Sequence, residues 1–350
     1  MPQLKTIDSS DIEEIMSNLN NQISILNNKK ILLLGSGGFL GKYFVRVFDY
    51  ILENKRNKFY VDCFDNFISS NPEINNVTSK KISFIKNDII NYKFKKKYDY
   101  IIFLAGIASP LIYKKYPLET LKVSYEGVKN LLEKSKKDKS KFIFFSSSEI
   151  YGNPDHKNLP TKETYYGNVN SFGPRSCYDE GKRIGETLCY VFKEYFNCSV
   201  NIIRPFNIFG PLMAKNDFRI LPNIIDKIKK NKTILIHGNG QQTRTFCYIT
   251  DAMTGFFKVI LSNKYGRIWN IGNPNNEISM INLIKIFNSI LKKENKYKLI
   301  NYPKNYPADE PMRRCPDITQ SRKNLNFKPK IGIKRGILRM IKYNELNIKK

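Results

Sequence analysis

Apolar residues in the first part of the chain change from helical spacing to short continuous runs. Between residues 8 and 26 they recur every three or four positions, which predicts a helix ahead of the first strand. We expect this helix, part of an N-terminal extension over residues 1–28, to pack on the core as an added element. Its apolar positions are Ile12, Ile15, Met16, Leu19, Ile23 and Leu26.

Beyond this helix, strand patterns and helical patterns alternate. Continuous apolar runs predict strands at 31–34, 59–64, 82–85, 100–104, 141–146 and 199–204, and the clearest helical patterns cover 117–134 and 176–196. Such alternation is typical of an α/β fold with a doubly wound parallel sheet that helices cover on both faces.

The regular alternation weakens after Arg204, where Pro and Gly become more frequent. We therefore predict a Rossmann-type domain over 29–205, which also receives about 245–272. A smaller α+β substrate-binding region is predicted from 206–244 and 273–350.

The first predicted strand leads directly into a glycine-rich turn, Gly35-Ser36-Gly37-Gly38-Phe39-Leu40-Gly41, and a helical pattern follows. Glycines at 35, 38 and 41 permit a tight turn, close approach of the backbone to a pyrophosphate, and close contact between helix and strand. The helix N-terminus adds free N–H groups for the phosphates. In this strand–turn–helix context the pattern predicts dinucleotide binding.

An acidic residue is expected at the end of the second strand, and both Asp62 and Asp65 are available. Asp65 is preferred for the ribose hydroxyls of the adenosine. A carboxylate there repels a 2′-phosphate, so NAD is favoured over NADP. Asp88, after the third strand, is a candidate for the adenine amino group, with a simple turn aspartate as the alternative.

Tyr178 and Lys182 are four residues apart near the start of the predicted helix 176–196, so they share one face. A phenol with a pKa near ~10 must have that pKa lowered by roughly three units to act as a base near neutrality. We expect the lowering from the lysine ammonium and from the positive nicotinamide.

Two further residues follow the predicted strand 141–146, at the edge of the sheet where ligands bind in open α/β folds. Ser147 is expected to hydrogen-bond the reacting sugar oxygen beside Tyr178. Glu149 is placed to exchange a proton with a carbon acid. The alternative for Glu149 is an ordinary ion pair with one of the many lysines.

Composition narrows the function classes. A hydrophobic content of 41% supports a folded core, and six cysteines without a CxxC pair give no reason to expect a metal site or disulfides. No apolar run is long enough to cross a bilayer and no secretory signal is seen, so we expect a cytoplasmic protein without membrane association. The formal net charge of +28 comes from dispersed lysines, which we interpret as compositional bias that favours anionic substrates rather than nucleic acid.

Seven short stretches between about Lys30 and Lys330 carry a family resemblance. They are Ala108-Ser109-Pro110, Ser147 to Gly152, Gly173 to Arg183, Arg204 to Pro211, Thr243 to Tyr248, Asn270 to Pro274, and Arg313 to Ile318. Together they resemble the UDP-glucuronate decarboxylases (UDP-xylose synthases) among the extended short-chain dehydrogenases. The stretch from Gly173 to Arg183 is the most specific to that group.

The resemblance implies NAD-dependent decarboxylation of UDP-glucuronate to UDP-xylose through a C4 ketone, and a homodimer formed by the helices near 117–134 and 176–196. The implied catalytic residues are Tyr178, Lys182, Ser147, Glu149 and Arg314, with Arg314 facing the substrate carboxylate. The implied cofactor contacts are Gly35, Gly38, Phe39, Leu40, Gly41, Asp65, Asp88, Leu104, Ala105, Tyr178 and Lys182. The implied contacts to the nucleotide-diphosphate sugar are Ser109, Ser148, Asn207, Arg219, Arg244, Tyr248 and Arg314.

Other activities of related enzymes remain alternatives. Enzymes that resemble dTDP-glucose 4,6-dehydratase carry Thr-Asp-Glu at the strand end, where this chain has Ser148 in place of the aspartate. GDP-mannose-type dehydratases need only a hydroxyl and a glutamate at this place. A 4-epimerase has little need of Glu149, and a non-catalytic binding module predicts a broken Tyr–Lys pair. This chain also has Leu212 where the decarboxylases commonly have arginine.

Overall fold

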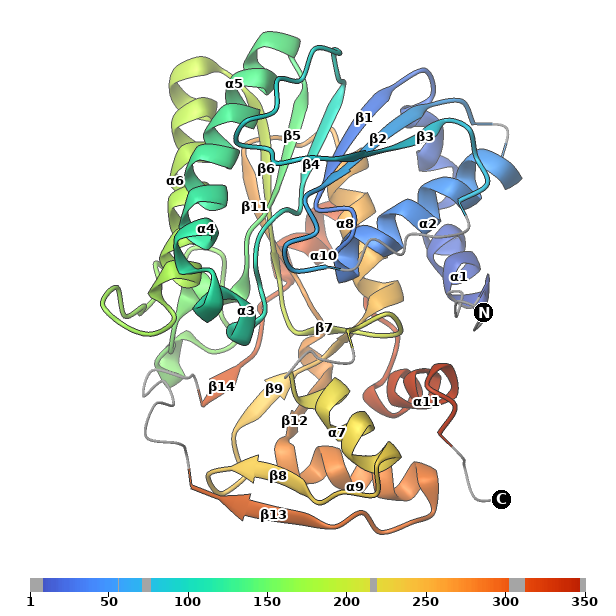
Figure 1. The fold of residues 1–350 in the computed structure, drawn as a ribbon, viewed down its shortest axis with the longest axis vertical. Coiled ribbons are helices and arrows are strands. Elements are labelled where there is room, and N and C mark those ends of the chain that lie inside the picture. Colours follow the sequence, from blue (N-terminus) through green and yellow to red (C-terminus); the bar gives the residue numbers. More distant parts are fainter. Residues whose placement is uncertain (1–8, 56, 71–76, 215–218, 302–311, 347–350) are drawn as a thin grey trace.

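The computed structural model describes residues 9–55, 57–70, 77–214, 219–301 and 312–346. At its centre is a seven-stranded sheet in the order β11-β6-β5-β4-β1-β2-β3, in which every pairing is parallel (Figure 1). The predicted doubly wound α/β fold is confirmed, and each predicted strand end is within one residue of the observed one. The strands are β1 (Lys30–Leu34), β2 (Tyr60–Asp65), β3 (Ile82–Lys86), β4 (Tyr100–Phe103), β5 (Lys141–Phe145), β6 (Ser199–Pro205) and β11 (Arg267–Ile271).

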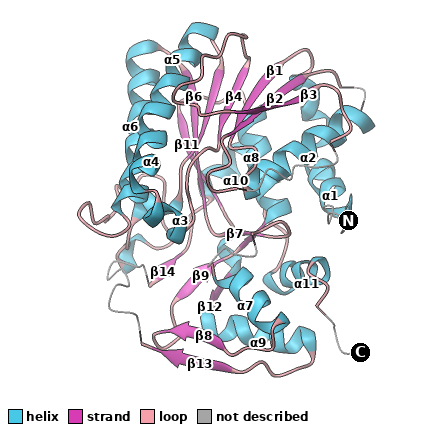
Figure 2. Cartoon of the chain, viewed as in Figure 1, coloured by secondary structure: helices cyan, strands magenta, loops and turns pink. Residues whose placement is uncertain are grey.

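Both faces of this sheet are buried, which explains why its strands read as continuous apolar runs. Successive side chains of β1 point to opposite faces. Ile31 and Leu33 pack in the core that contains α2 and α8, while Leu32 and Leu34 pack in the core that contains α5 and α6. Figure 2 shows these two helical layers on either side of the strands. The helices are α2 (Phe39–Asn54), α5 (Val128–Asp138), α6 (Ser176–Phe196) and α8 (Ile249–Leu261).

The helix predicted over 117–134 forms as three consecutive segments. They are α4 (Pro117–Lys122), one π-helical turn (Val123–Gly127) and α5, and a short helix α3 (Pro110–Lys115) precedes them. At the π turn the chain packs closely on α6, since a Cβ on Gly181 would come within 3.1 Å of the Ser124 hydroxyl. The helical periodicity of the sequence did not reveal this local widening.

A smaller part of the molecule follows β6 and lies beside the carboxyl-end edge of the sheet (Figure 1). It is built from short pairings, β8 with β13, β9 with both β12 and β14, and β7 with β10, together with α7 and α9. The bounds are β7 (Ile208–Phe209), α7 (Ile220–Lys229), β8 (Ile234–His237), β9 (Thr243–Thr245), β10 (Cys247–Tyr248), β12 (Glu277–Ser279), α9 (Met280–Leu291), β13 (Tyr297–Ile300) and β14 (Arg313–Arg314).

The sequence-based assignment of 273–350 to the small region needs one correction. Helix α10 (Thr319–Leu325) packs against β11 and α8 of the large part, where the Ser321 hydroxyl donates a hydrogen bond to the Asn270 carbonyl at 2.7 Å. The final helix α11 (Ile333–Tyr343) contacts α9 and β10. The last part of the chain therefore returns to the large sheet before it ends.

The N-terminal extension forms helix α1 (Ser9–Leu19) and a 3-10 segment (Asn20–Leu26) rather than one helix, and Asp8 is outside the described residues. Its predicted apolar residues are all buried in the core that also contains α8, which confirms that the extension packs on the core.

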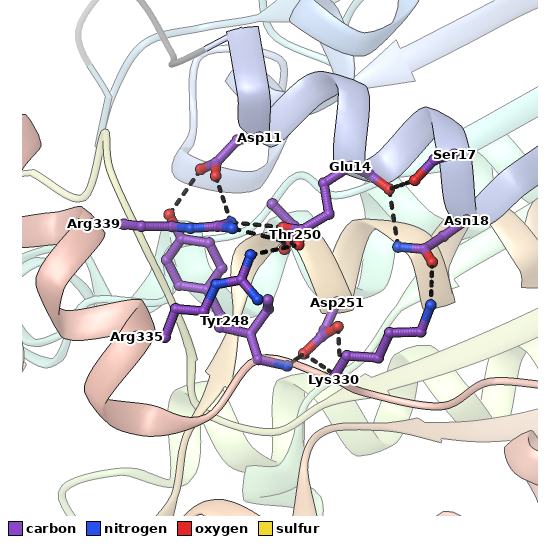
Figure 3. A network of polar contacts seen from close by, with 11 residues as sticks. Asp11, Glu14, Ser17, Asn18, Tyr248, Thr250, Asp251, Lys330, Arg335 and Arg339 are labelled. Atoms are coloured by element: carbon purple, nitrogen blue, oxygen red, sulfur yellow. Dashed lines mark hydrogen bonds and ion pairs between the residues drawn. The ribbon is translucent and has the colours of Figure 1, made fainter.

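Charged side chains tie α1 to α11 (Figure 3). Arg339 of α11 donates to Asp11 at 2.8 Å and to Glu14 at 2.6 Å. The hydroxyls of Tyr248 and Thr250, at the start of α8, donate to the same two carboxylates at 2.7 and 2.9 Å. We call these five residues the terminal clasp, because they join the first and last helices of the described chain.

Candidate active site

The glycine turn after β1 needs glycine at two positions. Gly35 has a φ of +85°, and a Cβ there would be 2.7 Å from the Ala105 backbone nitrogen. A Cβ on Gly41 would be 2.2 Å from the Gly35 carbonyl oxygen. Helix α2 begins at Phe39 with Gly38 as its N-cap, and the Ser36 hydroxyl is buried without a hydrogen-bond partner among the described residues. The turn thus combines the N-terminus of α2 with the Ser36 hydroxyl, two groups that can donate hydrogen bonds to an anion.

The structure distinguishes the two aspartates of β2. Asp65 lies against the glycine turn, where its carboxylate accepts from the backbone N–H groups of Gly37 at 2.8 Å and Phe67 at 2.7 Å. Asp62 instead accepts from Lys96, Ser83 and Tyr98, away from the turn, and these hydrogen bonds lower its pKa against the effect of burial.

The other predicted cofactor residues follow neighbouring strand ends. Asp88 accepts from the Ile90 N–H at 2.9 Å and from the Asn66 side chain at 3.4 Å, which places it near the loop after β2. Leu104 and Ala105 directly follow β4, and the Leu104 N–H donates to the Leu34 carbonyl at 2.9 Å. The carboxyl ends of β1, β2 and β4 therefore bring the predicted set to one edge of the sheet.

Tyr178 and Lys182 lie on one face of α6 beside the end of β5, and they are 8% and 5% exposed. The Lys182 ammonium donates to the Phe145 carbonyl at 2.8 Å and lies 5.9 Å from the centre of the Tyr178 ring. The Tyr178 ring stacks on Tyr113, with 5.5 Å between centroids and 10° between planes. The phenol and the ammonium are thus fixed by packing next to the strand that carries Ser147.

The pKa values of Tyr178 and Lys182 both depart from their ordinary values. Burial raises the pKa of Tyr178 to about 12, although a hydrogen bond with Ser147 acts in the lowering direction. Burial also lowers the pKa of Lys182 to about 8.

Glu149 lies in the 3-10 turn that follows β5, and its carboxylate forms ion pairs with two guanidinium groups. Arg314 of β14 donates to both carboxylate oxygens, with Nη2 at 2.6 Å from Oε2, and Arg175 donates to Oε2. Arg314 is 7% exposed, so this ion pair is largely removed from water. Residues 165 positions apart in sequence are thereby brought together.

Two of the predicted substrate residues carry buried polar atoms. The Ser109 hydroxyl and the Asn207 side-chain nitrogen are buried without a hydrogen-bond partner among the described residues. Ser148 is buried next to Glu149. Arg219 begins α7, and its positive charge acts on the pKa of Tyr178 in the lowering direction.

Arg244 and Tyr248, two further predicted substrate residues, lie on β9 and β10. Arg244 of β9 pairs in register with Arg314 of β14, and its guanidinium donates to the Thr243 and Met312 carbonyls. Tyr248 is 0% exposed and its hydroxyl donates to Asp11 in the terminal clasp. The prediction that Tyr248 contacts the substrate is therefore wrong, because the resemblance gave no view of the N-terminal helix that covers it.

Sequence reasoning missed Arg175 and Asp179, which are both buried beside Glu149. Arg175 is the N-cap residue of α6, and its Nε donates to Asp179 Oδ2 at 3.3 Å. Burial and the charge of Glu149 raise the pKa of Asp179. An available signal was their i, i+4 spacing around Tyr178 within the most family-specific stretch.

Other sequence predictions concern the absence of sites. All six cysteines are free thiols. Among the residues that the structure describes, no group of three or more His, Cys, Asp and Glu side chains is arranged to hold a metal ion. Within the same ranges, no helix has the length and apolar character to cross a membrane.

Comparison with known proteins adds to this geometry. The sequence model of the NAD dependent epimerase/dehydratase family matches residues 31–272. UDP-glucuronic acid decarboxylase 6 from Arabidopsis thaliana is 33% identical over 323 residues, which cover 92% of this chain and 90% of that protein. UDP-glucuronic acid decarboxylase 1 from Xenopus tropicalis is 31% identical, with 92% of this chain and 73% of that protein covered.

Solved structures show the same architecture. UDP-glucuronic acid 4-epimerase from Bacillus cereus, in complex with UDP-glucuronic acid and NAD, is 25% identical with a TM-score of 0.76, covering 90% of this chain and 99% of that chain. The epimerase Mth375 from Methanothermobacter thermautotrophicus has a TM-score of 0.81 at 21% identity and covers 94% of each chain, a likeness of fold alone.

Proposed function

Because the chain belongs to the NAD dependent epimerase/dehydratase family, we propose that it decarboxylates UDP-glucuronate to UDP-xylose through a C4-keto intermediate. The observation that carries this proposal is the buried pairing of Arg314 with Glu149 beside Tyr178. Removal of CO2 needs a cation for the substrate carboxylate and a group that returns a proton to carbon, and this pair supplies both. Relatives that are about one third identical over most of the chain are named UDP-glucuronic acid decarboxylases.

The residues at the glycine turn fit NAD. The turn has no room for a Cβ at Gly35 or Gly41, so its backbone can approach a pyrophosphate closely. The buried Ser36 hydroxyl and the N-terminus of α2 are the polar groups available to phosphates, and Asp65 is available to ribose hydroxyls. When bound, NAD supplies a hydride acceptor and the positive charge that favours an ionised phenol.

The chain's own groups then act on the sugar in order. Tyr178 accepts the proton of the C4 hydroxyl, which Ser147 helps to orient, as the C4 hydride leaves. The new ketone is β to the C6 carboxylate, so CO2 can depart and leave an enolate on the sugar. Glu149 takes up a proton from solvent and passes it to C5, and Tyr178 gives its proton back when C4 is reduced again.

The rest of the nucleotide sugar needs anion contacts, and arginines suit a diphosphate because of their planar fork. Arg219 and Arg244 are the candidates for the diphosphate, and Asn207, Ser109 and Ser148 are the candidates for the sugar. The positive net charge of the chain favours encounter with such a substrate.

The decisive assay supplies UDP-glucuronate and NAD and follows products by mass. Loss of CO2 supports the proposal, whereas a product of unchanged mass indicates 4-epimerisation and contradicts it. Loss of water from a UDP-, GDP-, CDP- or dTDP-hexose, without turnover of UDP-glucuronate, favours the dehydratase alternative. A Tyr178→Phe variant that retains full turnover contradicts every one of these C4-keto routes.

We also propose that the enzyme is a homodimer that pairs α4 to α6 with the same helices of a second copy. Leu118, Leu121, Tyr125 and Ile184 are exposed apolar residues on these helices, with Leu118 at 74%. Apolar side chains gathered on neighbouring helices favour a protein contact. Gel filtration at micromolar concentration is expected to give the dimer, and a purely monomeric profile contradicts this assignment.

A further inference from the structure

Glu149 is held from two sides by arginines of different elements. Arg314 reaches it from β14 and engages both oxygens, while Arg175 reaches it from the start of α6 and engages Oε2. Both arginines are less than one tenth exposed. The reaction proposed above assigns a task to Arg314 but leaves Arg175 without one.

Arg175 is itself anchored. Its Nε donates to Asp179 Oδ2 at 3.3 Å across one turn of α6. Its carbonyl oxygen accepts the N–H groups of Tyr178 at 2.9 Å and Asp179 at 3.0 Å. One helical turn therefore fixes both the guanidinium that touches Glu149 and the phenol that reacts at C4.

Among the described residues, the carboxylates of Glu149 and Asp179 form ion pairs with the guanidinium groups of Arg175 and Arg314. Arg314 now uses both of its Nη groups on Glu149. A substrate carboxylate that binds Arg314 competes with Glu149 for these donors and weakens that ion pair.

A mostly buried carboxylate that loses its cation is strongly destabilised and moves toward any cation that remains. Arg175 is that cation, because its contact with Glu149 does not depend on Arg314. Burial and the Glu149 charge raise the pKa of Asp179, so this residue is also able to take up a proton when a third carboxylate enters the cluster.

We propose that Arg175, anchored by Asp179, is a positioning residue that keeps Glu149 at the reacting carbon while Arg314 binds the substrate carboxylate. This inference rests on the proposed decarboxylation and assigns Arg175 to that step alone. Oxidation at C4 uses Tyr178, whose pKa burial raises, and Glu149 acts on that step only through its charge, which raises the same pKa further. The two steps are therefore expected to separate when Arg175 is changed.

The first experiment compares both steps in Arg175→Gln. Formation of NADH, followed by its absorbance after rapid mixing with UDP-glucuronate, is expected to stay within about twofold of wild type. Release of CO2 is expected to fall about 100-fold, the scale of a misplaced catalytic group. NADH and a 4-keto uronate should then accumulate, and KM should change little because Arg314 still binds the substrate.

Variants of the anchor and a matched control distinguish positioning from general stability. Asp179→Ala is expected to slow CO2 release selectively by about tenfold, and Asp179→Asn should restore most of it because the amide oxygen still accepts from Arg175. Lys134→Gln removes another largely buried i, i+4 pair, with Asp138 of α5, and serves as the control. It is expected to lower the melting temperature without changing the ratio of the two steps.

Equal slowing of both steps in Arg175→Gln at an unchanged melting temperature would overturn the inference. Release of CO2 by this variant at the rate of the wild-type protein would overturn it as well. If Arg175→Gln does not fold, the comparison of Asp179→Ala with Asp179→Asn decides. The role is then refuted if CO2 release in the alanine variant is not selectively slowed. Failure of wild-type protein to release CO2 overturns the proposed function itself and is visible before any variant is made.

Discussion

Replacing Lys182 by methionine is expected to stabilise the fold near neutral pH while it abolishes activity. Lys182 is 5% exposed, and burial lowers its pKa from 10.5 to about 8. A shift of about 2.5 units corresponds to about 3 kcal/mol of destabilisation of the charged form. Methionine has a similar length without the charge, but it leaves the Phe145 carbonyl without its donor, which costs about 1–3 kcal/mol.

The sign of the pH dependence follows from proton binding. Between the folded pKa of about 8 and the unfolded value of 10.5, the unfolded chain binds more protons, so wild-type stability rises with pH there. Below about pH 8 the full destabilisation is present. We therefore expect Lys182→Met to be more stable than wild type by about 1 kcal/mol near pH 7. Relative to wild type it should lose about 2 kcal/mol between about pH 7 and about pH 9.5.

Urea unfolding at the two pH values measures this difference. The single tryptophan, Trp269, is fully buried in β11 and its fluorescence reports on the large sheet. Lys141→Met is the control, because the pKa of Lys141 is raised and that variant should lose stability below its unfolded pKa. A difference between Lys182→Met and wild type that does not vary with pH would refute the reasoning, since it would mean that burial does not strain this ammonium.

Three further outcomes are expected. Tyr178→Phe should reduce NADH formation from UDP-glucuronate by about 100-fold or more, with unfolding free energy changed by less than about 1.5 kcal/mol, measured by absorbance and urea denaturation. Arg339→Ala should destabilise the fold by about 3 kcal/mol near pH 7 because Asp11 stays buried without its cation. The pKa of Glu14 is lowered by Arg339, so its share of this loss should disappear as pH falls below about 4.5, which acid titration of the two proteins can test. Asp65→Ser should narrow the preference for NAD over NADP in binding titrations, and an unchanged preference would remove Asp65 from the ribose site.

The sequence was sufficient for the fold, and it pointed to the candidate site, because both predictions depend on local patterns. Strands that are buried on two faces read as apolar runs, and a glycine turn or a Tyr-x-x-x-Lys spacing is visible within a few residues. The π-helical turn at Val123–Gly127 was missed because it keeps nearly the same apolar spacing as an α-helix.

The remaining features depend on contacts between distant segments. Tyr248 was assigned to the substrate because its neighbours resemble a family motif, yet α1 brings Asp11 over its hydroxyl. Arg175 was overlooked because only the folded chain brings it to Glu149. Burial of the ring raises the pKa of Tyr178, and sequence spacing carries no information on that packing.

The terminal clasp also constrains when this protein can finish folding during synthesis. Asp11 is synthesised well before Arg339, its ion-pair partner 328 positions later. Domains generally fold in the order in which they are made. Here the Asp11 carboxylate cannot be enclosed with its counter-charge until α11 has been released. We therefore expect nascent chains that stop short of α11 to keep α1 detached and to expose the apolar face that it covers on α8.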